Sequence, residues 1–444
     1  MNTELMETIK LTGAVGGFPE FLPAQQRAAD EIISIIKTQY ESYGYTPLET
    51  ATVEKIETLL AKGIAAKEVY GLRRLNAEDG EGDKELALRF DLTVPLARYV
   101  VQNQNELVFP FRRYQIQPVF RGERPQKGRY RQFHQADIDI LGQETLPLSA
   151  DAEVIACATQ TLAAILPKGE EFILRINNRK LLQGLVAWAG SADIPAAIKT
   201  IDNAEKVGWP KTIEGLIQTA IAAPKAEDLA ALLQASNLEN LTKLGLSGEA
   251  EEGLTELQTV LSLAKTLLPP ALHGNLKADL TIARGLDYYT GTVVETVVAS
   301  AKELGSVCSG GRYENLTASL GKKAIPGVGL SIGLSRLLAW LLTQEPWASM
   351  PATPATVLVT CQDENLMAYY AKVAQTLRQA GIKTELHPGG QALGTQIKNG
   401  VKRGLTFAIM ANDDDAKANR VQLKNLATAT QSEQALETLP TALL

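Results

Sequence analysis

The sequence predicts a mixed α/β (α+β) protein: an antiparallel sheet flanked by helices, a helical insertion, and a C-terminal α/β domain with a mixed sheet. Three observations support this prediction. Polar and apolar residues alternate with period two from about 86 to 142, which indicates strands. Residues 178–275 are rich in Ala, Leu and Lys at helical spacing. Residues 356–444 alternate short apolar runs with amphipathic stretches, which is typical of a small α/β domain.

The first part of the chain supplies the sheet and its first helix. Residues 24–43 predict an amphipathic helix, because Pro23 suits a first helical turn and Gly44 suits a helix end. Strand character returns at 277–300, and residues 327–343 predict a glycine-opened buried strand that runs into a helix. We therefore assign residues 1–177 and 276–344 to one domain of the two to four that 444 residues predict.

Prolines separate the other parts of the chain. Five of them interrupt the helical spacing of residues 178–275, which we predict to be a separate insertion. Three more lie within residues 345–355 and mark a linker. In the domain beyond it, residues 356–444, we expect strands at 357–360, 382–386, 405–411 and 421–426, and helices at 365–380, 391–404 and 431–439.

The composition narrows the class of protein. A hydrophobic fraction of 45% and a charged fraction of 21% fit a folded globular chain and argue against disorder. The net charge of -6 argues against a uniformly basic nucleic-acid coat. Cys157, Cys308 and Cys361 form no disulfide or zinc pattern; we expect them to be buried, and we predict no metal site. No apolar run approaches the roughly 18 residues of a membrane span, so a cytoplasmic location without a membrane partner is expected.

Residues 112–131 form the most informative segment. It carries seven Lys or Arg residues against one carboxylate, Glu123, a net charge of +6 in an acidic chain. Two glycines and a proline near its centre predict a loop, so we expect a long hairpin with a cationic tip. Arginine prevails over lysine, which favours bidentate binding of phosphate. A solvated surface loop is the alternative interpretation.

A polar face follows on the next predicted strand, residues 133–141. Alternation places on this face Phe133, Gln135, Asp137 and Asp139. His134 falls on the opposite, apolar face, where we expect a core residue. Amide and carboxylate groups beside an arginine-rich tip suit a ligand that has an ammonium or imidazole group next to a phosphate.

Four further segments contribute candidate side chains. Residues 86–100 contribute Arg89, Asp91 and Thr93, which alternation places on one face, and residues 281–291 contribute Arg284, Tyr288 and Tyr289. Residues 309–316 contribute Arg312 and Tyr313, and residues 327–340 contribute Arg336. The last segment is otherwise apolar. An arginine there requires an anionic partner, because an unpaired buried charge is costly.

Together these segments resemble class II aminoacyl-tRNA synthetases, and the histidyl-tRNA synthetases among them. VFRGERPQKGRYRQFHQADIDILG (119–142) is similar to motif 2, and GVGLSIGLSRL (327–337) is similar to motif 3. RGLDYYTG (284–291) and SGGRYENL (309–316) resemble two histidine-specific signatures, which generic class II enzymes lack. The resemblance covers essentially the whole chain, and residues 356–444 look like the anticodon-binding domain of the family.

The resemblance implies a role for each matching residue. At the nucleotide, Arg121 would bind the α-phosphate and the substrate carboxylate, Glu123 and Phe133 the adenine, and Arg336 the γ-phosphate. Arg129 would be a further ATP-binding residue. At the amino acid, Asp91, Thr93 and Gln135 would bind the α-amino group, and Asp139, Tyr289 and Tyr313 the imidazole ring. Tyr288 and Arg312 would be further substrate-binding residues. Arg284 would lie at the α-phosphate and, with Arg121, act in catalysis.

The implied activity is activation of L-histidine with ATP and transfer of histidine to tRNA(His) by a homodimer. Attack of one anion on another depends on positioning and positive charge, and Mg²⁺ would bridge the phosphates of ATP. A site whose polar groups hydrogen-bond both nitrogens of the imidazole ring rejects an apolar amino acid strongly, because that amino acid would leave these groups unpaired. Such a site needs no separate editing activity, so the helical insertion need not be an editing domain. Ala51 stands where we align the motif 1 proline, which in the family lies at the dimer interface.

Two alternatives stand beside this interpretation. One is a non-catalytic regulatory subunit of ATP phosphoribosyltransferase, and the other is an RNA-binding sensor. Regulatory paralogues lack the anticodon-binding domain and commonly lose the arginines that this chain keeps as Arg121, Arg284 and Arg336. The charge is also uneven: +6 in residues 112–131, +1 in residues 355–444 and -13 in the rest. That distribution predicts local, salt-sensitive binding of tRNA.

Overall fold

A computed structural model describes residues 13–60, 66–74, 85–126, 128–283, 289–314, 317 and 324–443. The chain divides into two compact units, one of residues 1–19 and 32–341 and the other of residues 20–31 and 342–444. The second unit includes the start of helix α1 (Pro23–Ser42), because the Arg27 guanidinium donates hydrogen bonds to the carbonyl oxygens of Pro351 and Thr353. The domain limits predicted from the sequence remain a prediction.

The larger unit is built on an eight-stranded sheet with the order β1-β4-β5-β10-β9-β8-β6-β7. In that order the strands are Thr46–Pro47, Phe111–Phe120, Gln132–Leu141, Gly327–Ile332, Cys308–Tyr313, Thr292–Val298, Phe172–Asn178 and Leu276–Ala278. The interior pairs are antiparallel, and only β1 with β4 and β6 with β7 are parallel. The long hairpin predicted around residues 112–131 is β4 and β5, and the antiparallel sheet is confirmed.

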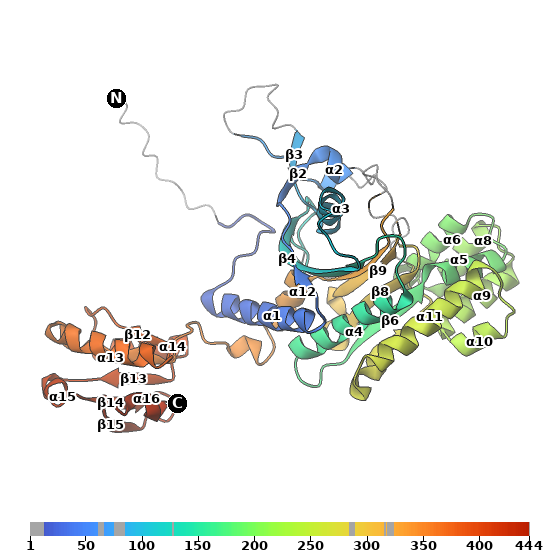
Figure 1. Cartoon of the computed structure of the whole chain (residues 1–444). Coiled ribbons are helices and arrows are strands. Elements are labelled where there is room, and N and C mark those ends of the chain that lie inside the picture. The colour runs from blue at the N-terminus through green and yellow to red at the C-terminus, as the bar shows by residue number, and fades with distance from the viewer. Residues whose placement is uncertain are drawn as a thin grey trace. The chain divides into compact units, whose positions relative to one another are not determined.

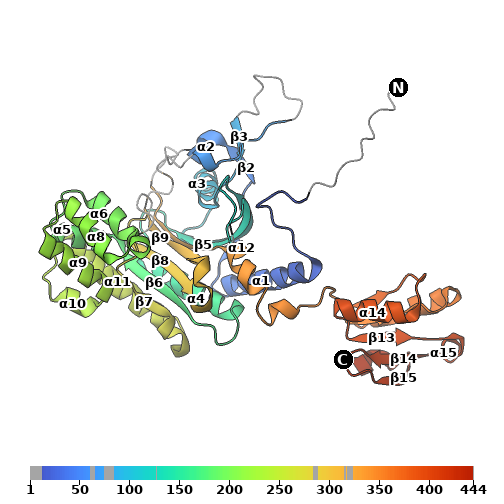
Figure 2. The same ribbon diagram turned by 180° about the vertical axis from the view of Figure 1, so that it is seen from behind.

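Helices cover both faces of this sheet, as Figures 1 and 2 show from opposite sides. On one face lie α2 (Ile56–Leu60) and α3 (Thr93–Gln102), and on the other α4 (Leu148–Ile165) and the C-terminal half of α1. Ile32, Ile36 and Tyr40 of α1 are fully buried, and the Tyr40 hydroxyl donates to the carbonyl oxygen of Ala136 on β5. The last helix of the unit, α12 (Leu334–Leu341), follows β10 as predicted.

The strand predicted through residues 86–100 is wrong beyond its start. Only β3 (Leu86–Leu88) is a strand, paired with β2 (Val53–Lys55), and α3 follows after a short turn. The Asp91 carboxylate accepts a hydrogen bond from the backbone N–H of Val94 at 3.0 Å, which satisfies a donor at the helix start. Helical spacing then buries Val94, Ala97 and Val100. Packing of this apolar stripe therefore prevailed over the alternation that the sequence suggested.

The predicted insertion is helical. It comprises α5 (Arg179–Trp188), α6 (Ile194–Asp202), α7 (Ala204–Val207), α8 (Trp209–Gln218), α9 (Ala223–Ala235), α10 (Leu238–Thr242) and α11 (Glu249–Thr266), followed by the short 3-10 helix Pro270–Asn275. Asn178 begins it, because its side chain accepts from the backbone N–H groups of Lys180 and Leu181. A Cβ atom added at Gly184 or Gly253 would overlap Ala250 or Leu181, so these glycines permit the close approach of α5 and α11.

The smaller unit is an α/β sheet with the order β12-β11-β13-β14-β15. In that order the strands are Thr384–Leu386, Val357–Val359, Phe407–Met410, Arg420–Asn425 and Gln431–Ala435. The strands β12, β11 and β13 are parallel to one another, whereas β14 pairs antiparallel with both β13 and β15. The mixed sheet is therefore confirmed. Its helices are α13 (Met367–Gln379), α14 (Leu393–Arg403), α15 (Asp413–Lys417) and α16 (Leu439–Leu443).

The helix predicted over residues 431–439 is wrong. Residues 431–435 are β15, and the helix α16 begins only at Leu439. The Asn425 side chain accepts from the backbone N–H groups of Ala427 and Thr428, and Ala429 has a positive φ of 58°. This turn brings residues 431–435 back along β14, where ladder pairing overrides the helix propensity of Gln, Glu and Ala.

Two further expectations concern burial and membranes. All three cysteines are buried and free, as predicted. Within the part of the chain that the structure describes, no helix combines the length and the apolar character that a membrane crossing requires.

Candidate active site

A pocket of about 310 Å³ opens on the sheet of the larger unit, beside the loop that joins β4 and β5. One end is lined by Arg121, Glu123, Arg129, Phe133 and Arg336, and is mainly cationic. The other end is lined by Asp91, Thr93, Gln135, Asp137, Tyr289 and Ser331, and has carboxylate and neutral polar groups. The pocket thus has one end suited to phosphate and another suited to a cation or a hydrogen-bond donor.

The floor of the second end comes from paired residues of β4 and β5. Cross-strand register places three polar pairs side by side on one face: Arg113 with Asp139, Gln115 with Asp137, and Gln117 with Gln135. We call these six residues the polar floor. The alternation predicted for residues 133–141 is therefore confirmed. His134 lies on the opposite face, where it is half-buried, and burial lowers its pKa.

Glycines on the neighbouring strands make room for the floor and its aromatic neighbours. Gly329 on β10 lies opposite Asp139, and a Cβ atom there would overlap the Asp139 carboxylate. Added Cβ atoms at Gly327 and Gly311 would press on the rings of Tyr313 and Tyr289. The glycines of the SGGRY and GVGLSIG segments are thus required by close approach, and not by chain flexibility alone.

The two carboxylates of the floor have different surroundings. Asp139 is 2.5 Å from the Arg113 guanidinium through Oδ2, and its Oδ1 accepts from the Tyr313 hydroxyl at 2.6 Å. Burial raises the pKa of Asp139, while Arg113 and Tyr313 oppose that shift. Asp137 is 4.0 Å from Arg113 and is hydrogen-bonded by the Ser331 side chain, while its Oδ1 is buried and has no hydrogen-bond partner among the described residues. Burial raises the pKa of Asp137 to about 7, against the opposing effect of Arg113.

Gln135 has an acceptor that the protein leaves open. Its side-chain NH₂ donates to the Ser331 hydroxyl at 2.8 Å, while its carbonyl Oε1 is buried and has no hydrogen-bond partner within the part of the chain that the structure describes. Asp91 and Thr93 line the same end of the pocket at the start of α3. An ammonium group in this position would meet an amide oxygen, a carboxylate and a hydroxyl.

The cationic end is held in place by backbone contacts. The Arg121 Nε donates to the Phe90 carbonyl at 3.0 Å, and its guanidinium carbon is 5.1 Å from the centroid of the Phe133 ring. Arg336 donates to the carbonyl oxygens of Ser306 and Gly128 at 2.8 and 3.3 Å. Arg336 therefore connects the loop after β4 to the start of β9, and the side chains of both arginines line the pocket.

The structure does not bring every predicted residue to this pocket. Arg284 and Tyr288 lie outside the described residues. Arg312 points to the opposite face of the sheet from its neighbour Tyr313, because successive residues of a strand alternate. Its guanidinium pairs there with Asp151 of α4 at 2.5 Å and also donates to the Pro147 carbonyl. Arg312 thus does not line the pocket, although alternation within residues 308–313 could have indicated this.

Sequence reasoning missed the contribution of some residues. Asp137 was placed on the correct face but given no role, and Ser331 was overlooked within a glycine-rich strand. Arg113 was counted with the cationic tip of the hairpin, yet it is fully buried on β4. Its position opposite Asp139 follows from the register of the hairpin, which the sequence does not state.

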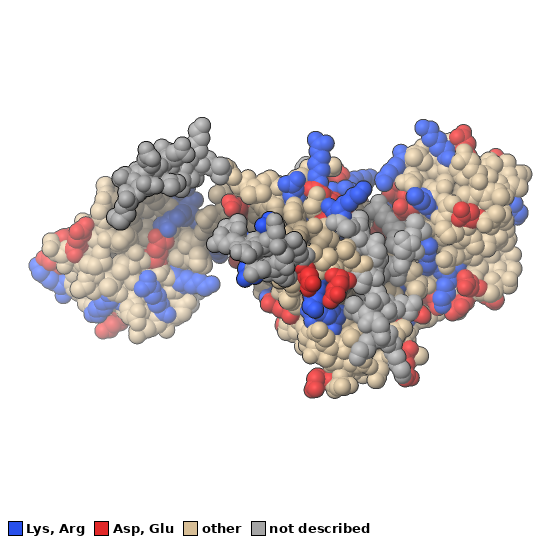
Figure 3. Space-filling model, turned by 90° about the horizontal axis from the view of Figure 1, so that it is seen from above, with Lys and Arg blue, Asp and Glu red and all other residues tan. Residues whose placement is uncertain are grey.

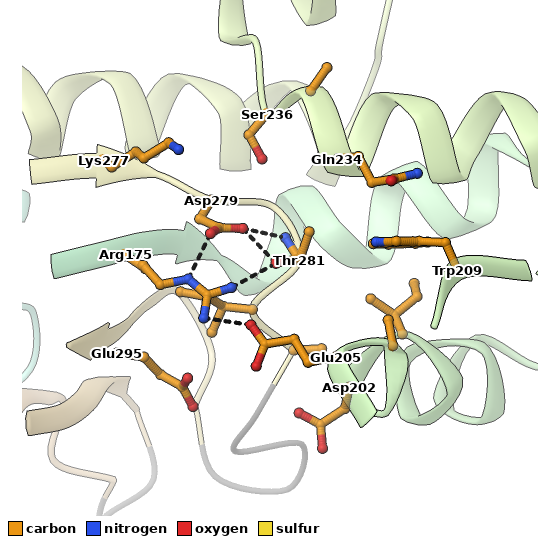
Figure 4. Close-up of a pocket in the computed structure, with 15 residues that line it drawn as sticks. Arg175, Asp202, Glu205, Trp209, Gln234, Ser236, Lys277, Asp279, Thr281 and Glu295 are labelled. Carbon is orange, nitrogen blue, oxygen red and sulfur yellow. Dashed lines mark hydrogen bonds and ion pairs between the residues drawn. The ribbon is translucent and has the colours of Figure 1, made fainter. Parts of the chain in front are cut away.

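A second pocket lies between β6, β7 and the insertion (Figure 4). Its principal cation, Arg175, is 2.7 Å from both Asp279 and Glu205, and it also donates to Thr281. Figure 4 shows these three partners converging on its guanidinium. Because the Arg175 guanidinium is already paired with two carboxylates, this pocket provides less positive charge for a phosphate than the cationic end of the first pocket does.

The sequence of the larger unit matches a known family over most of its length. The family model described as histidyl-tRNA synthetase matches residues 17–337. The chain belongs to the histidyl-tRNA synthetase family. The model described as an anticodon binding domain matches residues 356–444, which contain the whole sheet of the smaller unit.

Individual relatives agree with this membership. The histidine–tRNA ligase of Micrococcus luteus is 41% identical over 438 residues, which cover 94% of each chain. The crystal structure of histidyl-tRNA synthetase from Nostoc sp. PCC 7120 has a TM-score of 0.87 at 38% identity and covers 98% of this chain and 99% of that one. An ATP phosphoribosyltransferase regulatory subunit/histidyl-tRNA synthetase from Bacillus halodurans has a TM-score of 0.72 at 20% identity, with 88% and 97% covered, and shows the shared fold alone.

Proposed function

We propose that this chain is a histidine–tRNA ligase, which activates L-histidine with ATP to histidyl-adenylate and transfers histidine to the 3′ end of tRNA(His). The observation that carries this proposal is the pocket with two chemically distinct ends. A cluster of arginines adjoins a buried floor of amides and carboxylates, in a chain whose relatives are named histidine–tRNA ligases. Such a pocket suits an amino acid with a basic side chain next to a nucleotide phosphate.

The cationic end would bind ATP. Arg121 would bind the α-phosphate and the histidine carboxylate, while Arg336 and Arg129 would bind the outer phosphates. Phe133 and Glu123 would bind the adenine by stacking and by accepting a hydrogen bond from its amino group. The hydrogen bonds that hold Arg121 and Arg336 to backbone carbonyls support these roles, because a preorganised cation does not have to reorient as charge develops.

The other end would bind histidine. Asp91, Thr93 and the open acceptor of Gln135 would hold the α-ammonium group. The buried carboxylates of the floor, together with Tyr289 and Tyr313, would read the imidazole ring. An apolar amino acid of similar size would leave these groups unpaired, which supports strong discrimination without a proofreading step.

The chemical step would be in-line attack of the histidine carboxylate on the α-phosphorus, with pyrophosphate as the leaving group. The chain would contribute alignment and positive charge through Arg121 and Arg284, and no protein nucleophile is needed. Mg²⁺ would enter with ATP and neutralise charge on its phosphates. Among the described residues no three His, Cys, Asp or Glu side chains gather as metal ligands.

The rest of the assignment follows from the resemblance. Residues 356–444 would bind the anticodon, and the basic loop after β4 lies where an acceptor end could approach the pocket. Class II membership, the homodimer and the cytoplasmic location are parts of the same proposal. The match of residues 356–444 to an anticodon-binding domain favours the ligase over a regulatory subunit that lacks this domain.

Exchange of labelled pyrophosphate into ATP tests the proposal directly. We expect exchange that depends on L-histidine and that other amino acids do not support. Protein that is folded by circular dichroism yet shows no histidine-dependent exchange would refute the ligase and favour a binding role. Aminoacylation of tRNA(His) then tests the second step.

A further inference from the structure

We propose that a turn at residues 15–18 positions the base of the loop between β4 and β5, and that the binding of ATP depends on this turn. We call residues 15–18 the N-terminal turn, and residues 121–123 with 131–132 the loop base. The inference rests on the proposed function and names a positioning element for its nucleotide end. None of residues 15–18 lines the pocket, so the turn would act only through the loop base.

The N-terminal turn fits a type II β-turn. The Phe18 N–H donates to the Val15 carbonyl at 3.0 Å, and Gly17, at the third position, has a φ of +87°. A type II turn requires a positive φ at this position, which glycine adopts without strain. Gly16, at the second position, is not in this conformation. The turn therefore requires glycine at residue 17 and accepts another residue at 16.

Hydrogen bonds join this turn to the loop base. The Gly17 carbonyl accepts from the backbone N–H groups of Arg131 and Gln132, at 2.8 and 3.1 Å. The Arg131 Nε donates to the Glu123 carbonyl at 3.1 Å, and its Nη1 is 3.5 Å from the Gly16 carbonyl. The Arg131 side chain thus connects the turn with the opposite strand of the loop base.

A second segment holds the loop base at Gly122. The Gly122 N–H donates to the Glu68 carbonyl at 2.8 Å. Two residues beyond Glu68, the ring of Tyr70 packs against Phe18 of the N-terminal turn, with the ring centroids 6.4 Å apart. The Tyr70 carbonyl accepts from the Leu88 N–H on β3 at 2.9 Å. The loop base is thus held by two segments that contact each other, and one of them is hydrogen-bonded to β3.

The loop base carries side chains of the cationic end of the pocket. Arg121 and Glu123 line that end, and Phe133, which also lines it, follows Gln132 directly. The Arg121 N–H donates to the Arg131 carbonyl at 2.8 Å, so a shift of one is passed to the other. The other end of the pocket is lined from the start of α3, from β5 and from β10. Displacement of the turn should therefore weaken the binding of ATP more than that of histidine, because only the cationic end loses its preorganised geometry.

Gly17→Ala in the full chain tests the inference, with Gly16→Ala as the matched control. A Cβ atom at Gly17 would lie 2.9 Å from the Cγ atoms of Arg131 and Pro125, and the positive φ strains any residue that has a Cβ. Nothing lies within 4 Å of a Cβ atom at Gly16. In histidine-dependent pyrophosphate exchange we expect Gly17→Ala to raise the KM for ATP by about 5- to 30-fold, the range for the loss of one or two hydrogen bonds, and the KM for histidine by less than about twofold. Gly16→Ala should leave both KM values at the wild-type level.

A double-mutant cycle with Arg131→Ala tests whether the turn acts through the loop base. Arg131→Ala removes the hydrogen bond to the Glu123 carbonyl and also the Cγ atom that a side chain at residue 17 would meet. It should raise the KM for ATP by itself. Adding Gly17→Ala to it should raise that KM by less than about a further threefold, because the two changes disrupt the same contact. The lost charge of Arg131 is common to both arms of the cycle and cancels.

The outcomes separate the inference from the proposed function. Wild-type protein without histidine-dependent exchange would refute the function itself. Active wild-type protein in which Gly17→Ala leaves the KM for ATP unchanged, or raises both KM values equally, would overturn the inference alone. Effects of Gly17→Ala and Arg131→Ala that multiply in the double variant would show that the turn does not act through Arg131, and would overturn it as well.

Discussion

Asp137 and Asp139 lie two residues apart on one strand, and they face the same side of the sheet. Their environments differ because Arg113 lies directly opposite Asp139 in the register and only diagonally from Asp137. Neither identity nor spacing distinguishes the two carboxylates. At the scale of the residue, the cross-strand partner therefore decides the chemistry.

The titration of Asp137 gives a prediction about stability. Burial raises its pKa to about 7 from an ordinary value of 3.8, in a site faced by Arg113, Asp139, Asp91 and Tyr289. The folded protein therefore binds more protons than the unfolded chain between about pH 4 and 7, so stability is lost as the pH rises through that window. We expect the Tm of the wild type to fall between pH 5 and pH 8 relative to Asp137→Asn, by about 2–4 °C for each 1 kcal/mol lost. Parallel Tm curves for the two proteins would contradict this, and calorimetry without ligands is the measurement.

Arg284 gives a second prediction at this scale, carried over from the resemblance. Arg284→Ala should lower the rate of adenylate formation by about 100- to 1000-fold, the usual effect of removing one stabiliser of transition-state charge. Histidine affinity should change far less. Single-turnover adenylation together with equilibrium binding of histidine separates the two. A loss of binding alone would show that the role assigned to Arg284 is mistaken.

At the scale of the element, β10 shows why a strand near the pocket is rich in glycine. Gly327 and Gly329 face the same side as the polar floor, where Tyr313 and Asp139 need the space. A side chain at either position would displace a neighbour. The main contribution of β10 to the site is thus the space that its glycines leave for the side chains of Tyr313 and Asp139.

Gly329→Ala tests that role of β10. The added methyl group would overlap the Asp139 carboxylate and approach the Ile138 carbonyl, and overpacking of this kind costs about 1–3 kcal/mol. We expect a lower Tm and a raised KM for histidine, with little change in the KM for ATP. Gly274→Ala is the control, because nothing lies within 4 Å of a Cβ atom at that position. Equal behaviour of the two variants would remove the steric explanation.

At the scale of the whole molecule, the charge of residues 112–131 is less concentrated than the sequence suggested. Arg112 pairs with Glu153 and Arg113 is buried, so two of the seven cations lie on β4 and not at the tip of the hairpin. On the face seen in Figure 3, blue and red side chains are interspersed, and no continuous basic coat covers the visible surface. Binding of tRNA would therefore depend on a few local contacts.

Salt dependence tests this local binding. Each phosphate that a Lys or Arg neutralises releases counterions, so affinity falls as salt rises. We expect the KM for tRNA(His) to rise by at least tenfold between about 50 and 200 mM salt. The KM for histidine, whose contacts lie in a buried floor, should change little over that range. Aminoacylation kinetics at several salt concentrations measure both, and a flat tRNA profile would argue against phosphate contacts.

Removal of residues 356–444 tests whether the larger unit activates histidine and the C-terminal domain binds tRNA(His). A chain that ends at Ala355 keeps the Pro351 and Thr353 carbonyls to which Arg27 donates, so α1 retains these contacts. We expect histidine-dependent pyrophosphate exchange within about threefold of the wild type, because the pocket lies wholly in the other unit. Charging of tRNA(His) should fall by about 100-fold or more, if binding through this domain supplies about 3 kcal/mol. Equal loss of both activities would contradict the proposed roles.

The sequence by itself determined the antiparallel hairpin, the helical insertion and the C-terminal α/β domain, because hydrophobic periodicity and proline placement are local properties of the chain. The mixed sheet of that domain was implied by the resemblance. The sequence also placed Gln135 and Asp137 on the correct face of their strand, since alternation needs no partner. Only the tertiary structure decided that residues 93–102 form a helix and that residues 431–435 form a strand. In both cases packing or strand pairing with residues distant in the sequence outweighed the secondary structure that the local sequence favours. It likewise decided that Arg312 points away from the pocket and that Arg113 lies beside Asp139, because the register between strands is set by contacts between residues that are separated along the chain.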